Sequence, residues 1–270
     1  MTIPFTNNDR VTIELEECGV AQLRLARADK MNALDIAMFE ALVEAGDALA
    51  RSRGVRAVVL AGEGACFCAG FDLANFQSWQ GAAAPDLCVR THGEANLFQQ
   101  AALQWRRLPM PVIAAVHGAC LGGGLQLASG ADIRIVAPDA KLSILELKWG
   151  LVPDMAGFVL WRGLLRDDSL RELLFSHRIF SGEEALSLGL ATITDPDPLA
   201  RATAMARAIA GQNPDAVRAA KALANRTLDA TAAELLMAES TAQAGLMWSP
   251  NQLEAVASQM EKRAARYIDP

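Results

Sequence analysis

Two carboxylates stand in a part of the chain where their surroundings favour proton transfer. Glu146 ends the mostly apolar stretch 142–146, and Asp154 follows eight residues later in a Gly-Leu-Val-Pro-Asp-Met-Ala-Gly segment. A carboxylate in apolar surroundings is partly desolvated, which raises its pKa toward the range useful for acid–base catalysis. Two simpler interpretations stay open. Glu146 could be a solvent-facing edge residue, and Asp154 could cap a helix over residues 158–165.

Two glycine-rich stretches could bring backbone N–H groups to a ligand. One is Phe67–Leu73 (Phe-Cys-Ala-Gly-Phe-Asp-Leu), and the other is His117–Gln126, which contains three consecutive glycines at 122–124. Glycines between a strand and a helix allow close backbone approach, and the helix start leaves N–H groups unpaired, which suits an anion or a developing oxyanion. Neither stretch has the pattern of a phosphate loop or a dinucleotide fingerprint. Tight helix–strand packing is the alternative explanation of the glycines.

The elements that must position these residues alternate between strand and helix. Apolar periodicity predicts strands over 11–15, 23–25, 55–60, 111–116 and 132–136, and helices over 35–50, over 87–106 and from Gly122. This alternation predicts an α/β layered core. After about residue 180 the strand signals stop, and capping patterns such as Ser181–Glu184 and Thr231–Glu234 predict helices. We therefore expect a core over residues 1–195 and a helical portion over 196–270.

Composition and charge exclude several classes of protein. The chain has 270 residues, of which 52% are apolar and 21% charged, as in a globular protein. Its net charge of −6, without a basic stripe, argues against a nucleic-acid partner. Five cysteines are odd in number and fit no zinc spacing, which predicts reduced thiols in a cytoplasmic protein and no metal site. The uncharged run 108–131 contains two prolines and five glycines, which argues against a membrane span.

Taken together, the motifs resemble the enoyl-CoA hydratase/isomerase (crotonase) superfamily. Phe67–Leu73 and His117–Gly124 are similar to the segments that form its oxyanion hole, and Arg27–Leu34 is similar to its first CoA-contacting segment. The resemblance continues in the same order through Asp132–Ile135, Ile179–Ala185, Gly189–Leu190 and Glu261–Arg263. It covers about residues 10 to 267, and it specifies the superfamily far better than the reaction.

The resemblance implies an α/β crotonase (ClpP-like) fold, a spiral of repeated ββα turns with a helical C-terminal region that forms trimers or dimers of trimers. It implies an acyl-CoA thioester as substrate, with no separate cofactor and no membrane partner. It implies an oxyanion hole formed by the backbone N–H groups of Phe71 and Gly123. The implied CoA contacts are Arg27, Lys30, Ala33, Ala69, Asp72 and Leu73. The acyl chain is expected along Phe76–Leu97, where Trp79, Trp149 and Trp161 are candidate lining residues.

The reaction would depend on the side chains beside that hole. Hydratases of the family use two glutamates. The second aligns with Glu146, but the first aligns with Gln126, whose amide cannot act as an acid or a base. Dienoyl-CoA isomerases carry carboxylates at the positions of Gln126, Glu146 and Asp154, and enoyl-CoA isomerases can work with one glutamate at position 146.

We therefore expect Glu146 and Asp154 to transfer a proton and Gln126 to hold a water or the thioester. This predicts double-bond isomerisation of an enoyl- or dienoyl-CoA in fatty-acid metabolism. The alternatives are hydration of a 2-enoyl-CoA, another acyl-CoA reaction of the superfamily, and a non-catalytic acyl-CoA-binding role. RNA binding, known for one relative, is disfavoured by the net charge.

Overall fold

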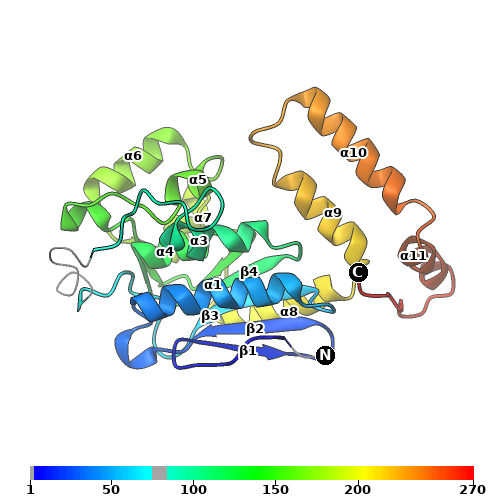
Figure 1. The fold of residues 1–270 in the computed structure, drawn as a ribbon, viewed down its shortest axis with the longest axis horizontal. Helices are drawn as coiled ribbons and strands as arrows, with labels where there is room; N and C mark the ends of the chain where they lie inside the picture. Colours follow the sequence, from blue (N-terminus) through cyan, green and yellow to red (C-terminus); the bar gives the residue numbers. More distant parts are fainter. Residues whose placement is uncertain (1–2, 75–83) are drawn as a thin grey trace.

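The computed structural model describes residues 3–74 and 84–270, and its strands form two sheets (Figure 1). Within these residues the larger sheet has the order β1-β2-β3-β4-β6-β9 and the smaller one the order β5-β7-β8. The larger sheet contains β1 (Val11–Leu15), β2 (Val20–Leu25), β3 (Ala57–Gly62), β4 (Val112–Val116), β6 (Ile133–Val136) and β9 (Ile193–Thr194). The smaller sheet contains β5 (Ala119–Leu121), β7 (Lys141–Ser143) and β8 (Phe180–Ser181). From β2 to β9 all neighbours in the larger sheet are parallel, as expected when helices connect the strands.

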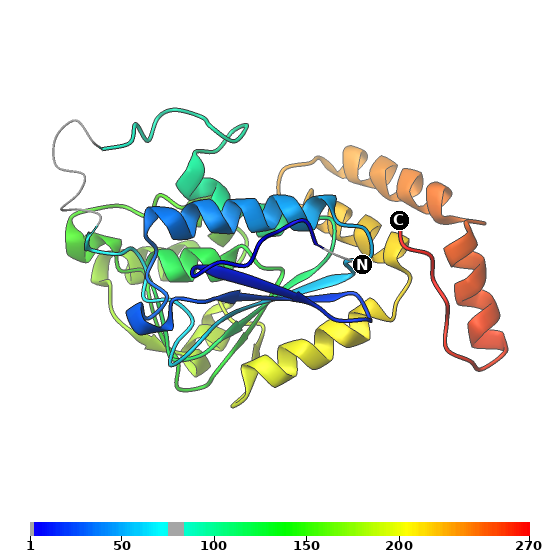
Figure 2. The same ribbon diagram turned by 60° about the horizontal axis from the view of Figure 1, so that its bottom comes forward.

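Helices cover both faces of the larger sheet. The α-helices of the described residues are α1 (Ile36–Arg51), α3 (Leu97–Arg107), α4 (Gly123–Ser129), α5 (Gly157–Trp161), α6 (Asp167–Ser176), α7 (Gly182–Leu188), α8 (Pro198–Ala210), α9 (Pro214–Ala224), α10 (Ala232–Leu246) and α11 (Pro250–Met260). Two 3₁₀ turns, η1 (Ala28–Lys30) and η2 (Glu146–Trp149), flank the site described below. Figure 2 shows α1 on one face of the sheet and α8 on the other. The predicted α/β layered core is confirmed.

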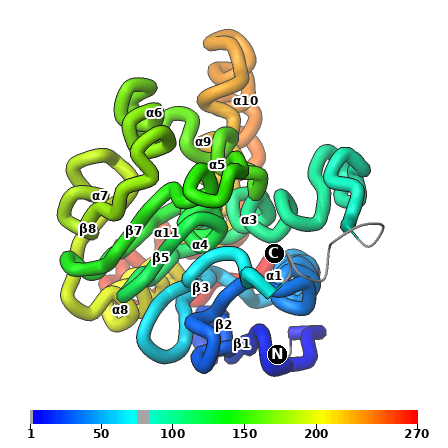
Figure 3. The backbone as a smooth tube through the Cα atoms, turned by 90° about the vertical axis from the view of Figure 1, so that its left-hand side faces the viewer, coloured from blue at the N-terminus to red at the C-terminus, as the bar shows by residue number. Residues whose placement is uncertain are grey.

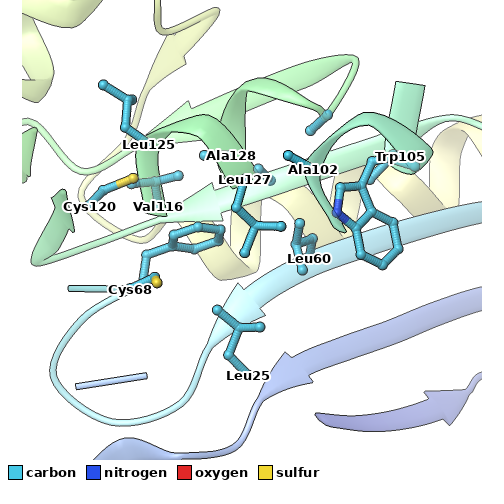
Figure 4. Close-up of a cluster of buried hydrophobic side chains, with 14 of the residues drawn as sticks. Leu25, Leu60, Cys68, Ala102, Trp105, Val116, Cys120, Leu125, Leu127 and Ala128 are labelled. Atoms are coloured by element: carbon cyan, nitrogen blue, oxygen red, sulfur yellow. The ribbon is translucent and has the colours of Figure 1, made fainter. Parts of the chain in front are cut away.

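The core follows the two-residue period of the strands. On β3, Val58 and Leu60 belong to the main apolar cluster, together with Trp105 of α3 and Leu127 of α4 (Figure 4). The alternate β3 residues, Ala57, Val59 and Ala61, belong to a second cluster that includes three alanines of α8. Successive strand side chains point to opposite faces, so one apolar strand can serve both clusters.

The uncharged run 108–131 forms the centre of this core. All five residues of β4 and all seven of α4 are buried, and β5 lies between these two elements in the sequence. A charge would therefore have no solvent to face along either element. No helix of the described residues is long and apolar enough to cross a membrane.

Three predicted boundaries are wrong. The helix expected over 87–106 begins only at Leu97, because Asn96 and Gln99 form a capping box and residues 87–95 form turns and bends. The strand expected over 55–60 is β3, two residues later. The strands do not stop at residue 180, since β8 and β9 follow; each has two residues, too few to show an alternating pattern.

The segment after residue 196 is mainly helical, as expected, but its helices differ in how they contact the larger sheet. The first of these helices, α8, packs on β3, β4 and β6. In Figures 1 and 3, α10 extends away from the sheet. Buried Lys221 attaches α9 to the core, donating to the carbonyls of Trp105 and Met110 at 3.0 and 2.9 Å and to Asp132 at 2.7 Å. The division at residue 195 remains a prediction, and α8 belongs by its packing to the sheet.

Candidate active site

A pocket of about 630 Å³ gathers ten of the eleven residues expected from the sequence to form the site. These ten are Lys30, Ala33, Ala69, Phe71, Asp72, Leu73, Gly123, Gln126, Glu146 and Asp154. The eleventh, Arg27, does not line the pocket. Segments separated by more than 100 residues thus meet in one concave surface.

Backbone pairing fixes the segment that carries Phe71. The Leu34 N–H donates to the Gly70 carbonyl at 2.8 Å, and the Asp72 N–H donates to the Leu34 carbonyl at 3.0 Å. These two bonds use the residues on either side of Phe71 and hold its segment beside Leu34. Gly70 has φ +94°, and a Cβ atom on it would lie 2.6 Å from the Leu121 carbonyl oxygen and 3.6 Å from the Gly123 nitrogen. The two segments expected to form the oxyanion hole are therefore in direct contact.

The triple glycine serves close packing and the pocket together. Gly122 has φ +50° and ψ −117°, a backbone conformation that residues with a side chain rarely adopt. Gly123 is the first residue of α4, so its N–H has no acceptor within the helix. A Cβ on Gly124 would lie 2.4 Å from the Cys68 carbonyl oxygen. Tight packing is therefore confirmed as one role of these glycines, and Gly123 lines the pocket. Binding of an oxyanion by its N–H group stays a prediction.

Asn32 is a structural residue that the sequence did not single out. Its side-chain nitrogen donates to the carbonyls of Glu63, Cys66 and Phe67 at 2.9, 3.0 and 3.2 Å, and its oxygen accepts from the Arg27 N–H at 3.0 Å. It is fully buried, so these four bonds join η1 to the loop that leads to Phe71. The asparagine is visible in the sequence within a motif that resembles the family's, but its partners are not.

The Cys68 thiol supports the same loop. It donates to the Asn32 carbonyl at 3.1 Å and accepts a weak bond from the Gly70 N–H at 3.4 Å. Burial raises its pKa to about 12, so it stays protonated at neutral pH. Cys66 and Cys120 are also buried free thiols. These cysteines are packing residues, consistent with the absence of a zinc pattern in their spacing.

Glu146 is half-buried at the start of η2, so it is not a solvent-facing edge residue. Its Oε1 accepts from the Gln126 side chain at 2.6 Å, and its Oε2 is buried with no hydrogen-bond partner among the described residues. Burial, with a smaller contribution from the charge of Asp154, raises the pKa of Glu146. A desolvated carboxylate with an uncommitted oxygen is suited to accept a proton from a bound molecule.

Asp154 lies on the loop between η2 and α5, flanked by buried Pro153 and Met155. The residue is exposed overall, and it lines the pocket. Crowding by the surrounding protein still raises its pKa. The helix that follows is α5, whose N-cap is Ala156, so Asp154 is not a helix cap.

The two cations expected to contact CoA differ in their surroundings. Arg27 donates to Asp72 at 2.6 Å and to the Ala33 carbonyl at 3.1 Å, and it lies 3.5 Å from Asp35. Its charge is thus committed to holding the loop after Phe71. Hydrogen bonds from the Ala74 N–H and from Arg27 keep the pKa of Asp72 low. Lys30 is exposed, lines the pocket and makes no ion pair within the described residues.

The remaining lining residues are largely apolar. Trp149 lines the pocket as expected, whereas Trp161 is a core residue whose indole N–H donates to Ser129 at 2.9 Å. Trp79 and the part of Phe76–Leu97 over residues 76–83 lie outside the described residues. Phe39 and Phe98 form an edge-to-face pair with ring centroids 4.8 Å apart. These two phenylalanines were missed at the level of sequence because each occupies an apolar helix face and has the signature of an ordinary core residue.

Comparisons with known proteins agree with this geometry. A family model described as enoyl-CoA hydratase/isomerase matches residues 16–270. The chain is 30% identical to the mitochondrial Delta(3,5)-Delta(2,4)-dienoyl-CoA isomerase of Mus musculus, with 97% of this chain and 83% of that protein covered. It is 38% identical to a probable enoyl-CoA hydratase of Bacillus subtilis (strain 168), over 68% of this chain and 70% of that protein.

A comparison with solved structures gives the same family. The enoyl-CoA hydratase of Bacillus anthracis matches with a TM-score of 0.87 and 27% identity, covering 96% of this chain and 98% of that chain. The chain belongs to the enoyl-CoA hydratase/isomerase family. It is an enzyme of that family, has the crotonase fold and shares the family's class of acyl-CoA thioester substrates.

The close contact at Gly70 can be tested by comparison with a second glycine that also has positive φ but has no close neighbour where a Cβ atom would lie. Gly93 also has positive φ, at +66°, and a Cβ on it would meet no atom of the described residues within 4 Å beyond its chain neighbours. We expect Gly93→Ala to lower the free energy of unfolding by about 1 kcal/mol, from the backbone penalty alone. Gly70→Ala should cost about 2–4 kcal/mol, because the new methyl group also displaces backbone at Leu121. Urea unfolding measures both, and equal losses would contradict the close contact.

Proposed function

We propose that the protein isomerises the double bond of an enoyl- or dienoyl-CoA by moving a proton between two carbons. The observation that carries the proposal is the combination of groups in one pocket. Two carboxylates with raised pKa, Glu146 and Asp154, line it together with Phe71 and Gly123, and the third family position is an amide, Gln126. Two proton carriers without a second glutamate fit isomerisation better than two-glutamate hydration.

In the proposed reaction the thioester oxygen accepts hydrogen bonds from the Phe71 and Gly123 N–H groups. Glu146 removes a proton from the carbon next to the thioester. The electron pair of the broken C–H bond passes into the conjugated enolate, whose oxygen the two N–H groups stabilise. Asp154, in its protonated form, then delivers a proton to a more distant carbon, and the double bond shifts. Both carboxyl groups return to their starting states by exchange with solvent, so the product is an isomer and no water is consumed.

CoA would lie across the rim formed by Lys30, Ala33, Ala69, Asp72 and Leu73. Lys30 supplies the positive charge for the CoA phosphates in this proposal, because its ammonium group is exposed at the pocket. Arg27 acts indirectly, by holding Asp72 and the loop that carries Phe71. A single cation near the pocket can thus attract the CoA phosphates, although the net charge of the chain is −6.

Glu146→Gln tests the function. It removes the proton acceptor while preserving shape, and we expect turnover of 3-enoyl- or 3,5-dienoyl-CoA to fall about 10³-fold. Wild-type activity should fall as Glu146 becomes protonated, at a pH above that of an exposed glutamate, because burial raises its pKa. The readout is the absorbance of the conjugated thioester that isomerisation creates. Glu40→Gln, an exposed glutamate on α1, is the matched control. Wild-type turnover by the Glu146 variant would refute the proposal.

We also propose a homotrimer or a dimer of trimers. Helix α10 has no buried residue, and Leu236 and Met237 on it are 63% and 68% exposed. Trp248, just beyond α10, is 76% exposed. Apolar area of this kind is expected to be covered in an assembly. Sedimentation analysis should give three or six times the chain mass. Met237→Glu should lower the fraction of assembled protein, whereas the control Glu239→Lys should leave it unchanged. A wild-type monomer would contradict this.

A further inference from the structure

We infer that Gln126 acts as a positioning residue: its side-chain amide holds one oxygen of Glu146, leaves the other without a hydrogen-bond partner among the described residues, and anchors the backbone on the α5 side of Asp154. This inference rests on the proposed function and changes the role expected for Gln126, which was to hold a water or the thioester. Three sets of contacts carry it.

The orientation of the amide is determined by its donors. The Met155 and Gly157 N–H groups both point to Gln126 Oε1, at 3.0 and 2.9 Å. An N–H can donate only to the oxygen of an amide, so the NH₂ group must face the other way, toward Glu146. Gln126 is 1% exposed, so its amide depends on these protein partners for hydrogen bonds. A Cβ on Gly157 would lie 2.7 Å from Oε1, so this contact requires a glycine there.

The amide makes the two oxygens of Glu146 different. Oε1 receives the Gln126 N–H at 2.6 Å and lies against Gly122, whose Cβ position would be 3.4 Å away. Oε2 is buried and has no partner among the described residues. The hydrogen-bonded oxygen is the weaker base, so Oε2 becomes the proton acceptor. A glutamate at position 126 would instead place a second carboxylate beside Oε1, and the pair would have to share a proton.

The same amide holds the loop that carries Asp154. Residues 151–154 have no regular secondary structure, and the two bonds to Gln126 attach residues 155 and 157 to α4. Met155 in turn packs on Gly123, where a Cβ would lie 2.8 Å from its sulfur. One side chain thus links the helix start, η2 and the Asp154 loop. Fixed geometry of this kind controls rate, since displacement of a catalytic group by about 1 Å can cost about 10²-fold.

The experiment compares Gln126→Leu with Gln104→Leu. Gln104 is also buried, at 4% exposure, but it is not one of the residues that line the pocket. It belongs to α3, and its side chain donates to the Leu42 carbonyl of α1 at 2.9 Å. The charge that acts on Glu146 is that of Asp154 in the neighbouring loop, and Lys30 and Asp72 are the other charged residues that line the pocket. All three are unchanged in both variants, so a difference between the variants reports on the amide.

For Gln126→Leu we expect kcat to fall about 10²-fold, with KM for the CoA ester changed much less. The acid limb of the rate profile should move to higher pH, because the lost bond favoured the charged form of Glu146. The Glu146 carboxyl resonance, assigned by its loss in Glu146→Gln, should titrate at higher pH in the same variant. Hydrogen exchange at the Met155 and Gly157 amides should accelerate. Gln104→Leu should change none of these.

A Gln126→Leu variant with an unchanged Glu146 titration and unchanged exchange at both amides would overturn the inference. So would a loss confined to KM, which would indicate that Gln126 contacts the substrate. The titration and the exchange need no turnover. If the wild type isomerised no CoA ester, the proposed function would fail while these two measurements still decided the role of Gln126.

Discussion

The pocket depends on two places where backbone segments approach so closely that only glycine fits between them. A Cβ on Gly70 would lie 2.6 Å from the Leu121 carbonyl, and one on Gly124 would lie 2.4 Å from the Cys68 carbonyl. These contacts press the loop of Phe71 against the start of α4. The bridge between Leu34 and Phe71 adds η1 and its neighbours to the same assembly. The segment around Leu34, the loop of Phe71 and the start of α4 thus meet at the pocket. The loop of Phe71 and the start of α4 can meet because glycine has no side chain.

A second feature is the low charge around that junction. The run from β4 to α4 contains no Asp, Glu, Lys or Arg, and the carboxylates of Glu146 and Asp154 come from the segment that follows it. Burial raises the pKa of both. Of the two cations considered, Arg27 does not line the pocket and is paired with Asp72, whereas Lys30 lines the pocket and is exposed. In the proposed reaction, backbone N–H groups stabilise the developing negative charge, and the raised pKa values suit the two carboxyl groups to proton transfer.

Much of this could be predicted from the sequence because it depends on local order. The glycine-rich stretches, the positions of Glu146 and Asp154 and most strands are visible as motifs or periods. The true start of α3 was also available, since Asn96 and Gln99 have the spacing of a capping box.

The sequence could not reveal the features that depend on long-range contacts. Arg27 and Lys30 are equivalent cations in the sequence, and only the pairing with Asp72, 45 residues away, separates them. The side-chain oxygen of Gln126 accepts hydrogen bonds from N–H groups 29 and 31 residues later in the chain. Strands of two residues, such as β8 and β9, carry no period at all.

The central claim is that Glu146 and Asp154 move a proton between two carbons of an acyl-CoA without adding water. The most direct test is the mass of the product formed from 3-enoyl- and 3,5-dienoyl-CoA in ¹⁸O-labelled water. Isomerisation predicts a product of unchanged oxygen content and mass, with gained conjugated absorbance. A product that carries one labelled oxygen would show that the enzyme hydrates its substrate and would contradict the account.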